Sequence, residues 1–127
     1  MVVKTNKGFV KVPFEKIMYV ECVNFFCLLF LEDGKRLENS CSLLLMEKKL
    51  FRHKFSKIGR SYLVNLDHVM MLKRYNSRKW SVVMDNGLEL PIAYRRLVRF
   101  KKEYLQEMGD ANDDALDEVK YRTRQIP

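Results

Sequence analysis

Apolar and polar residues alternate in short runs along most of the chain, which is the pattern of half-buried β-strands. The segments with this pattern are 2–4, 9–12, 17–22, 24–31, 35–39, 61–64, 69–73, 80–84 and 88–90. Valine, isoleucine, phenylalanine and tyrosine are frequent in them, as expected of strand residues. The pattern therefore predicts a mainly β fold built of small antiparallel sheets, accompanied by two short helices.

Two short sequences predict tight hairpin turns between these strands. Asp33-Gly34 follows one apolar run, and Asn86-Gly87 joins two others. Glycine adopts a positive φ without a steric penalty, and Asn-Gly is the strongest short-range hairpin signal. We expect Pro91 to close the strand that follows Asn86-Gly87.

Two segments have the composition and spacing of helices. The first is expected over about residues 42–52, with Ser42 or Ser40 as its N-cap. The second begins near Ala93, and Gly109 would stop it. The apolar residues that recur at helical spacing in the second segment are Leu97, Phe100, Tyr104 and Leu105.

The chain has 127 residues, which is enough for one domain with a hydrophobic core. We expect this domain to span residues 1–108 and to be followed by a polar, acidic tail over residues 109–127, part of which could continue the helix. No apolar run approaches the roughly 20 residues that cross a bilayer, and the first residues lack the apolar core of a secretory signal. These features predict a cytoplasmic protein with no membrane partner.

The three cysteines, Cys22, Cys27 and Cys41, contain no CxxC pair. We expect them to be buried free thiols in a reducing compartment, with a redox switch or a metal site as the alternative. His53 and His68 have no metal-ligand spacing to any cysteine, so neither a metal nor another cofactor is predicted.

Motifs of catalysis are missing from the sequence, because it contains no GxGxxG, P-loop, GxSxG or HExxH pattern. Glu21 lies among apolar strand residues, where a hydrogen bond to backbone or to a neighbouring cation is expected rather than a catalytic role. The sequence therefore predicts neither an enzyme nor a small-molecule substrate.

Positive charge is concentrated in one part of the chain. Residues 48–84 contain ten Lys or Arg and a single acid, Asp67. The whole chain carries a net charge of +8, but residues 1–102 have 21 basic and 9 acidic side chains (+12), and residues 103–127 have 3 basic and 7 acidic ones (−4). Such a basic surface favours a polyanion, above all nucleic acid, while an anionic membrane surface and acidic proteins are the alternatives.

Two arginines in the basic regions stand beside short or turn-forming residues, Arg60 and Arg95. A guanidinium presented there can bind a guanine edge or a phosphate through two parallel hydrogen bonds, although pairing with a surface carboxylate is the alternative. Lys73 and Lys79 are expected to meet phosphate if they touch DNA at all. Asn65, between two apolar residues, is expected to be a buried, turn-stabilising amide rather than a base reader.

Four ordered landmarks give the chain a specific resemblance. They are residues 14–21, the helix 43–55 ending in phenylalanine, the run RSYLVNL at 60–66 and the run NGLELPI at 86–92. Each is loose alone, but in this order and spacing they resemble a LytTR-type DNA-binding domain, the output module of one class of bacterial response regulators. The resemblance covers residues 2–104.

The resemblance implies a mainly β fold of small sheets in an elongated arrangement. It also implies binding to double-stranded DNA through loops that enter major grooves, with one domain on each of two promoter repeats, where a homodimer could form. Three places commonly touch DNA in such domains. They correspond here to Asn24-Phe25, to Gly59-Arg60 and to Tyr94-Arg95-Arg96.

The sequence departs from the family pattern at each of these places. A histidine often precedes the Arg-Ser pair, and here that residue is Gly59. A Ser-Arg pair often follows the last strand, and here Ala93-Tyr94 follows it, with Arg95 next. Phe25 stands where a polar reader is frequent. The resemblance thus leaves the bases that are read unspecified.

The sequence predicts a sequence-specific, DNA-binding transcriptional regulator of a bacterial two-component system, or the DNA-binding half of one. The expected DNA contacts are Asn24, Phe25, Lys57, Arg60, Ser61, Arg95 and Arg96. The alternative is a protein-interaction or regulatory module that kept the fold and lost base-specific readout. In that case the acidic tail could cover the basic face.

Overall fold

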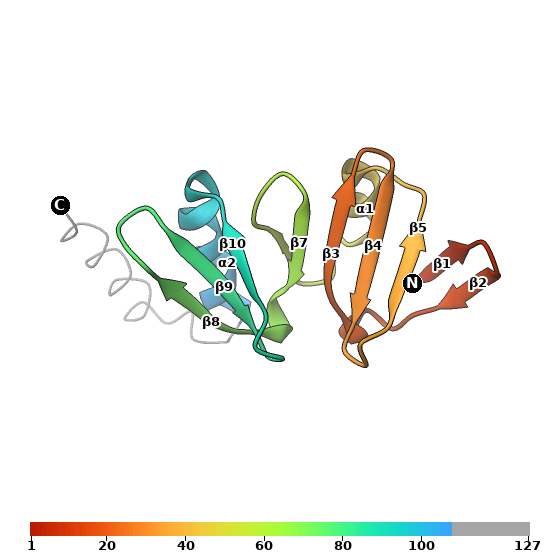
Figure 1. Ribbon diagram of the computed structural model, residues 1–127, viewed down its shortest axis with the longest axis horizontal. Coiled ribbons are helices and arrows are strands. Elements are labelled where there is room, and N and C mark those ends of the chain that lie inside the picture. Colours follow the sequence, from red (N-terminus) through yellow and green to blue (C-terminus); the bar gives the residue numbers. More distant parts are fainter. Residues whose placement is uncertain (108–127) are drawn as a thin grey trace. The chain divides into compact units, whose positions relative to one another are not determined.

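The computed structural model describes residues 1–107, which form two compact units that divide between His68 and Val69 (Figure 1). The described chain contains ten β-strands in three antiparallel sheets, together with two α-helices, so the predicted mainly β fold is confirmed. The expected helix stop at Gly109 and the expected tail lie outside the described residues. None of the helices in residues 1–107 is long and apolar enough to span a membrane.

The first unit is built around a five-stranded sheet with the order β5-β4-β3-β7-β6. The elements of this unit are β1 (Val2–Thr5), β2 (Gly8–Lys11), the 3-10 helix η1 (Phe14–Lys16), β3 (Ile17–Val23), β4 (Phe26–Leu31), β5 (Arg36–Asn39), α1 (Leu43–Lys49), β6 (Phe55–Lys57), β7 (Tyr62–Asn65) and the 3-10 helix η2 (Leu66–His68). The β1–β2 hairpin lies next to β5 (Figure 1).

The core of the first unit lies between the sheet and α1. Val20 and Leu29 of the sheet are completely buried, as is Met46 of the helix, and they belong to one cluster of packed apolar residues. The predicted N-cap is confirmed, because the Ser42 hydroxyl accepts a hydrogen bond of 3.2 Å from the Leu45 amide. This contact fixes where the helix begins.

The second unit contains β8 (Val69–Arg74), β9 (Trp80–Met84), β10 (Glu89–Ile92), the 3-10 helix η3 (Tyr94–Arg96) and α2 (Leu97–Glu107). The strand order is β10-β9-β8, and the register places Val82 opposite both Leu72 and Leu90. Helix α2 is tied to this sheet, because the Lys101 ammonium lies 4.3 Å from the centre of the Trp80 ring and the Tyr104 hydroxyl donates to the Val69 carbonyl.

Several element boundaries differ from the sequence prediction. Pro91 does not close a strand but lies inside β10, which is tolerated because β10 is at the edge of its sheet and one side needs no hydrogen bonds. The three-residue strand β6 was not expected, and α1 ends at Lys49 rather than near residue 52. The α-helix after Ala93 begins only at Leu97, following η3. The Asn86-Gly87 turn is confirmed, with Gly87 at a φ of +89°.

The expectation of three free thiols is wrong for two of them. Cys22 and Cys27 face each other across β3 and β4 and form a disulfide, with Cα atoms 4.1 Å apart. Directly opposed residues in an antiparallel pair come this close only at positions that do not exchange backbone hydrogen bonds. Cys41 is free and buried, and this burial raises the pKa of its thiol. The pairing depends on strand register, which cysteine spacing alone does not specify.

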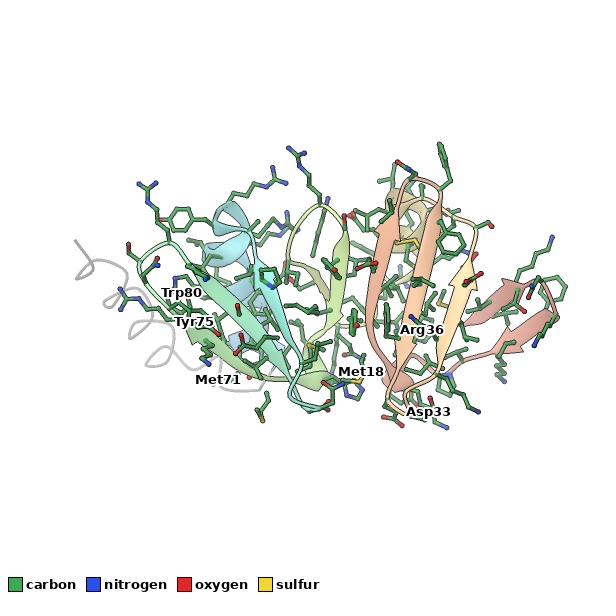
Figure 2. The ribbon with its side chains drawn as sticks, viewed as in Figure 1. Met18, Asp33, Arg36, Met71, Tyr75 and Trp80 are labelled. Carbon is green, nitrogen blue, oxygen red and sulfur yellow. A yellow bond between two sulfur atoms is a disulfide. The ribbon has the colours of Figure 1, made fainter. Side chains whose placement is uncertain are left out.

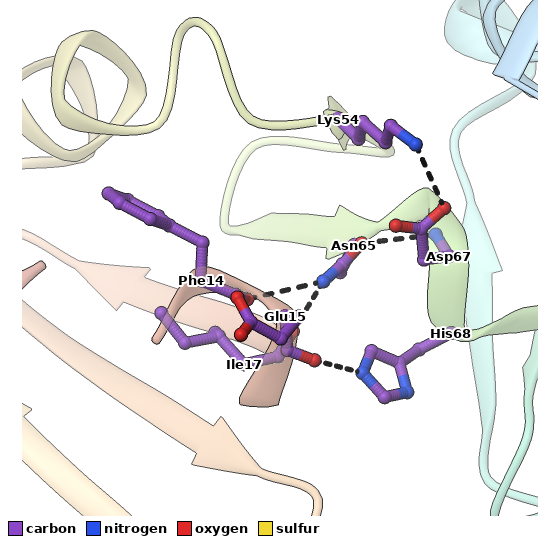
Figure 3. Close-up of polar contacts among 7 residues, drawn as sticks. All are labelled: Phe14, Glu15, Ile17, Lys54, Asn65, Asp67 and His68. Carbon is purple, nitrogen blue, oxygen red and sulfur yellow. Dashed lines mark hydrogen bonds and ion pairs between the residues drawn. The ribbon is translucent and has the colours of Figure 1, made fainter. Parts of the chain in front are cut away.

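Asn65 at the end of β7 connects three segments of the first unit (Figure 3). Its side-chain amide donates to the carbonyl of Ile17 at 2.9 Å and, at 3.4 Å, to that of Phe14, and its oxygen accepts from the Asp67 amide at 3.0 Å. The residue is only 3% exposed, so water cannot replace these partners. The predicted role as a buried, turn-stabilising amide is confirmed. His68 adds a neighbouring link by donating to the Glu15 carbonyl.

Replacing Asn65 by leucine is expected to lower the free energy of unfolding by about 2–3 kcal/mol, because buried backbone groups lose their partners. Urea denaturation would measure the change. Asn76→Leu is the matched control, since the Asn76 side-chain oxygen accepts hydrogen bonds from two backbone amides in an exposed turn, where water can take its place. Equal losses in the two variants would contradict the assigned role of Asn65.

The cysteine assignment predicts a simple labelling pattern. Protein purified without reductant and unfolded in denaturant should take up one iodoacetamide label, on Cys41, because the other two sulfurs are joined. Reduction before labelling should give three labels. Intact-mass spectrometry would measure both, and three labels without reduction would refute the disulfide. The folded protein should label slowly, since the Cys41 thiol is buried and its pKa is raised.

Candidate nucleic-acid interface

Two loops of the first unit lie at the same end of its five-stranded sheet. Strand β3 pairs with β4 up to Val23 and Phe26, and it pairs with β7 from Glu21 and Tyr62. The turn between β3 and β4 and the loop between β6 and β7 therefore lie at the same end of the sheet. A hydrogen bond of 2.7 Å from the Cys22 amide to the Ser61 carbonyl joins them directly.

The β3–β4 turn presents two of the predicted contact residues, Asn24 and Phe25. Asn24 adopts a φ of +57°, a left-handed conformation that asparagine tolerates better than most residues. The Phe25 side chain is 80% exposed, so it is available to a partner. The Cys22–Cys27 disulfide crosses the two strands just behind this turn and fixes its base (yellow in Figure 2).

The β6–β7 loop presents Arg60 at an exposed position. Within the described residues Arg60 forms no ion pair, so the alternative of a surface carboxylate partner does not apply to it there. The neighbouring Gly59 does not have a positive φ, and a Cβ added there would meet no atom within 4 Å. Its small size is therefore not required by the backbone, and a larger side chain would fit.

Two further predicted residues on this side serve the fold as well. The Lys57 ammonium lies 3.4 Å from a carboxylate oxygen of Glu47 on α1, so a phosphate would have to compete with this ion pair. Ser61 is half-buried and supplies the carbonyl that joins the two loops.

Glu21 pairs with Tyr62 across β3 and β7, and the hydrogen bond between them raises the pKa of Tyr62 to about 12. The partner of the Glu21 carboxylate is thus the Tyr62 hydroxyl, and not the backbone group or cation that the sequence predicted.

In the second unit, Arg95 and Arg96 lie on η3, the turn between β10 and α2. The turn is stabilised by a 2.8 Å hydrogen bond from the Arg96 amide to the Ala93 carbonyl. Arg95 is exposed and forms no ion pair within residues 1–107, whereas Arg96 is half-buried. Tyr94, which precedes Arg95 on this turn, is 58% exposed. Both arginines thus extend from a short, ordered turn.

The basic block, residues 48–84, is less positive in the folded chain than in the sequence, because acids from outside it pair with its lysines. Lys73 lies 3.1 Å from Glu89 of β10, and Tyr75 donates a hydrogen bond to the same carboxylate. These hydrogen bonds, from Tyr75 first and then from Lys73, lower the pKa of Glu89. Lys79 lies over the Tyr75 ring, which sits with Trp80 on the β8–β9 hairpin (Figure 2). Lys73 is therefore a poorer phosphate contact than its sequence position indicates.

The described residues offer little for a metal or cofactor. No three His, Cys, Asp or Glu side chains of residues 1–107 lie close enough together to hold a metal ion. An open depression of about 200 Å³ lies beside η1, where the Phe14 and His53 rings stack. Its charged lining combines two bases with two acids, Arg52, Lys54, Glu15 and Asp67. The depression therefore favours neither an anion nor a cation.

The fold and these arginine-bearing loops agree with the comparison to known proteins. The family model of the LytTr DNA-binding domain matches residues 7–104. The chain belongs to this family. Among solved structures it is similar to the LytTr DNA-binding domain of a Bacillus cereus protein named as a methyl-accepting/DNA response regulator. That similarity has a TM-score of 0.70 at 27% identity and covers 81% of this chain and 94% of that one. No curated protein sequence matches the chain.

Membership of the LytTr family makes this chain a DNA-binding domain of the response-regulator class rather than a catalytic fold. Of the residues predicted to contact DNA, the LytTr fold brings Asn24, Phe25, Arg60 and Ser61 together at one end of a sheet. Arg95 and Arg96 belong to the other compact unit. The sequence did not point to the acids that neutralise parts of the basic block, because Glu47 and Glu89 lie outside it.

Proposed function

We propose that this chain binds double-stranded DNA sequence-specifically, as the output domain of a bacterial transcriptional regulator. The observation that carries the proposal is the exposed Arg60 on a loop whose position is fixed by the sheet. Arginine can donate two parallel hydrogen bonds to the O6 and N7 atoms of a guanine in the major groove. An arginine with no carboxylate partner keeps all its donors for such a contact.

The loops at the end of the five-stranded sheet would act together in this reading. Arg60 reads a base edge, while Asn24 supplies an amide that can pair with adenine. Phe25, exposed beside Asn24, would contact the apolar methyl group of a thymine. The disulfide behind the turn and the hydrogen bond between the two loops limit their motion, so less entropy is lost on binding.

Arg95 and Arg96 form the second proposed contact. They leave a 3-10 turn at the start of a helix, where Arg95 is exposed and can meet a base edge or a phosphate. The remaining basic side chains neutralise phosphates and release counterions, which adds affinity without specificity. We propose that one domain occupies each of two promoter repeats, in the cytoplasm, and that two copies could pair there.

Binding should weaken steeply as salt is added. If about six phosphates are engaged, the logarithm of the association constant should fall with the logarithm of salt concentration with a slope near −5. Fluorescence anisotropy with a labelled duplex, titrated at several salt concentrations, would measure the slope. A flat dependence would refute DNA binding through this basic surface and favour the protein-interaction alternative.

Arg60→Ala and Arg95→Ala should each weaken binding to a duplex selected from a random pool by about 1–3 kcal/mol and relax the preference at one base position. The reason is that each removes a guanidinium that reads a base edge. Selection of bound sequences with each variant would identify the relaxed position.

Arg36→Ala is a matched control for the first of these variants. Arg36 is an exposed arginine in the same sheet, but it pairs opposite Phe30 and so lies at the end away from the two loops. Its removal changes the net charge equally and should leave the base preference intact. A loss of specificity in Arg36→Ala as large as in Arg60→Ala would contradict the assigned reading loop.

A further inference from the structure

The turn between β8 and β9 and the 3-10 helix η3 lie at the same end of the three-stranded sheet. Trp80 at the start of β9 is paired with Ile92 at the end of β10. The residues just before Trp80 therefore come close to the residues just after Ile92. The sequence alone does not show that these segments are close, because they are more than ten residues apart along the chain.

One contact joins the two segments. The guanidinium carbon of Arg78 lies 5.8 Å from the centre of the Tyr94 ring. Within this distance a cation is attracted to the electron-rich face of an aromatic ring, and arginine can stack on the ring while its N–H edges stay available. Tyr94 directly precedes Arg95, so the contact brings Arg78 beside the proposed contact on η3.

The backbone around Arg78 is ordered by the turn itself. The Asn76 side-chain oxygen accepts hydrogen bonds of 2.9 Å from the amides of Arg78 and Lys79. The amide of Tyr75 donates to the Lys79 carbonyl at 2.8 Å and closes the hairpin. Arg78 thus starts from a fixed backbone position, which reduces the entropy lost when its side chain binds.

The other cations of this hairpin contact partners that do not belong to η3. Lys73 is paired with Glu89, and the Arg74 guanidinium lies over the Trp80 ring. Lys79 lies over Tyr75. Arg78 is exposed and, among the described residues, forms no ion pair. Among the cations of this hairpin, Arg78 is therefore the one that contacts an aromatic ring on η3. No carboxylate of the described residues balances its charge.

We propose that Arg78, positioned by Tyr94, is an additional DNA contact that binds a backbone phosphate next to the site served by Arg95. This inference rests on the proposed function and extends it to the β8–β9 hairpin, which is not one of the three places where the resemblance implies DNA contacts. A guanidinium stacked on a tyrosine keeps its N–H donors at the edge of its own plane, and two parallel donors suit two oxygens of a phosphate. The contact carries no base information, because phosphates are the same at every sequence.

Arg78→Ala should weaken binding to the selected duplex and to a shuffled duplex by the same factor, about fivefold at physiological salt, because one counterion fewer is released. The slope of the logarithm of affinity against that of salt should become less negative by about 0.9. Fluorescence anisotropy would measure both quantities. In ethylation interference, one phosphate whose ethylation prevents binding of the wild type should no longer affect binding of Arg78→Ala.

The Tyr94 contact gives a second, independent readout. Tyr94→Ala should weaken binding as much as Arg78→Ala, while Tyr94→Phe, which keeps the ring, should bind like the wild type. The double variant with both alanines should bind no worse than either single one, because the tyrosine acts through the arginine. Independent, multiplying losses would overturn the positioning role of Tyr94.

Arg99→Ala is the matched control, since Arg99 is an exposed arginine of the same unit that is held 3.0 Å from Glu103 on α2. An equal loss in Arg99→Ala would overturn the proposal by showing an effect of net charge alone. Unchanged binding in Arg78→Ala, with Arg95→Ala still impaired, would overturn it and leave the proposed function standing. Absence of salt-dependent binding by the wild type would instead overturn the proposed function.

Discussion

The pairing of β3 on both of its edges is the constraint on which the first unit depends. Its partner β4 follows directly in sequence, but β7 lies some forty residues further along the chain. The long-range pairing sets the β6–β7 loop beside the β3–β4 turn, where the Cys22 amide bonds to the Ser61 carbonyl. Asn65 then ties the end of β7 back to the start of β3 through the Ile17 carbonyl. Both ends of β7 are thus fixed against β3.

Folding also redistributes the charge of the chain. In sequence the basic block contains one acid, yet Glu47 and Glu89 reach it from neighbouring elements and pair with Lys57 and Lys73. These ion pairs are only partly buried and add little stability, since solvent still screens them. Their effect is on the surface, because they leave particular arginines as the unbalanced charges. Arg60 is one of them, and it lies at the end of a sheet where two loops meet.

Local signals in the sequence were sufficient for many of the elements. The Asn86-Gly87 hairpin and the Ser42 cap depend on neighbouring residues alone, and both are found in the structure. The resemblance to the LytTR family was also readable, because its landmarks preserve order and spacing. Pro91 was misjudged because its tolerance depends on β10 being an edge strand, and the cysteines because their pairing depends on register. Strand β6 is too short to show an alternating pattern and exists through its pairing with β7.

The order and pattern of residues were enough to infer the fold class, the family and the residue types offered to a polyanion. They also indicated that Asn65 is a structural amide, since a polar residue between buried neighbours must find partners within the fold. The tertiary structure alone decided which basic side chains remain unpaired and which loops lie together. The physical reason is that ion pairs, cation–π contacts and strand register join residues far apart in sequence. Arg78 and Tyr94 are such a pair, brought together only by the pairing of β9 with β10.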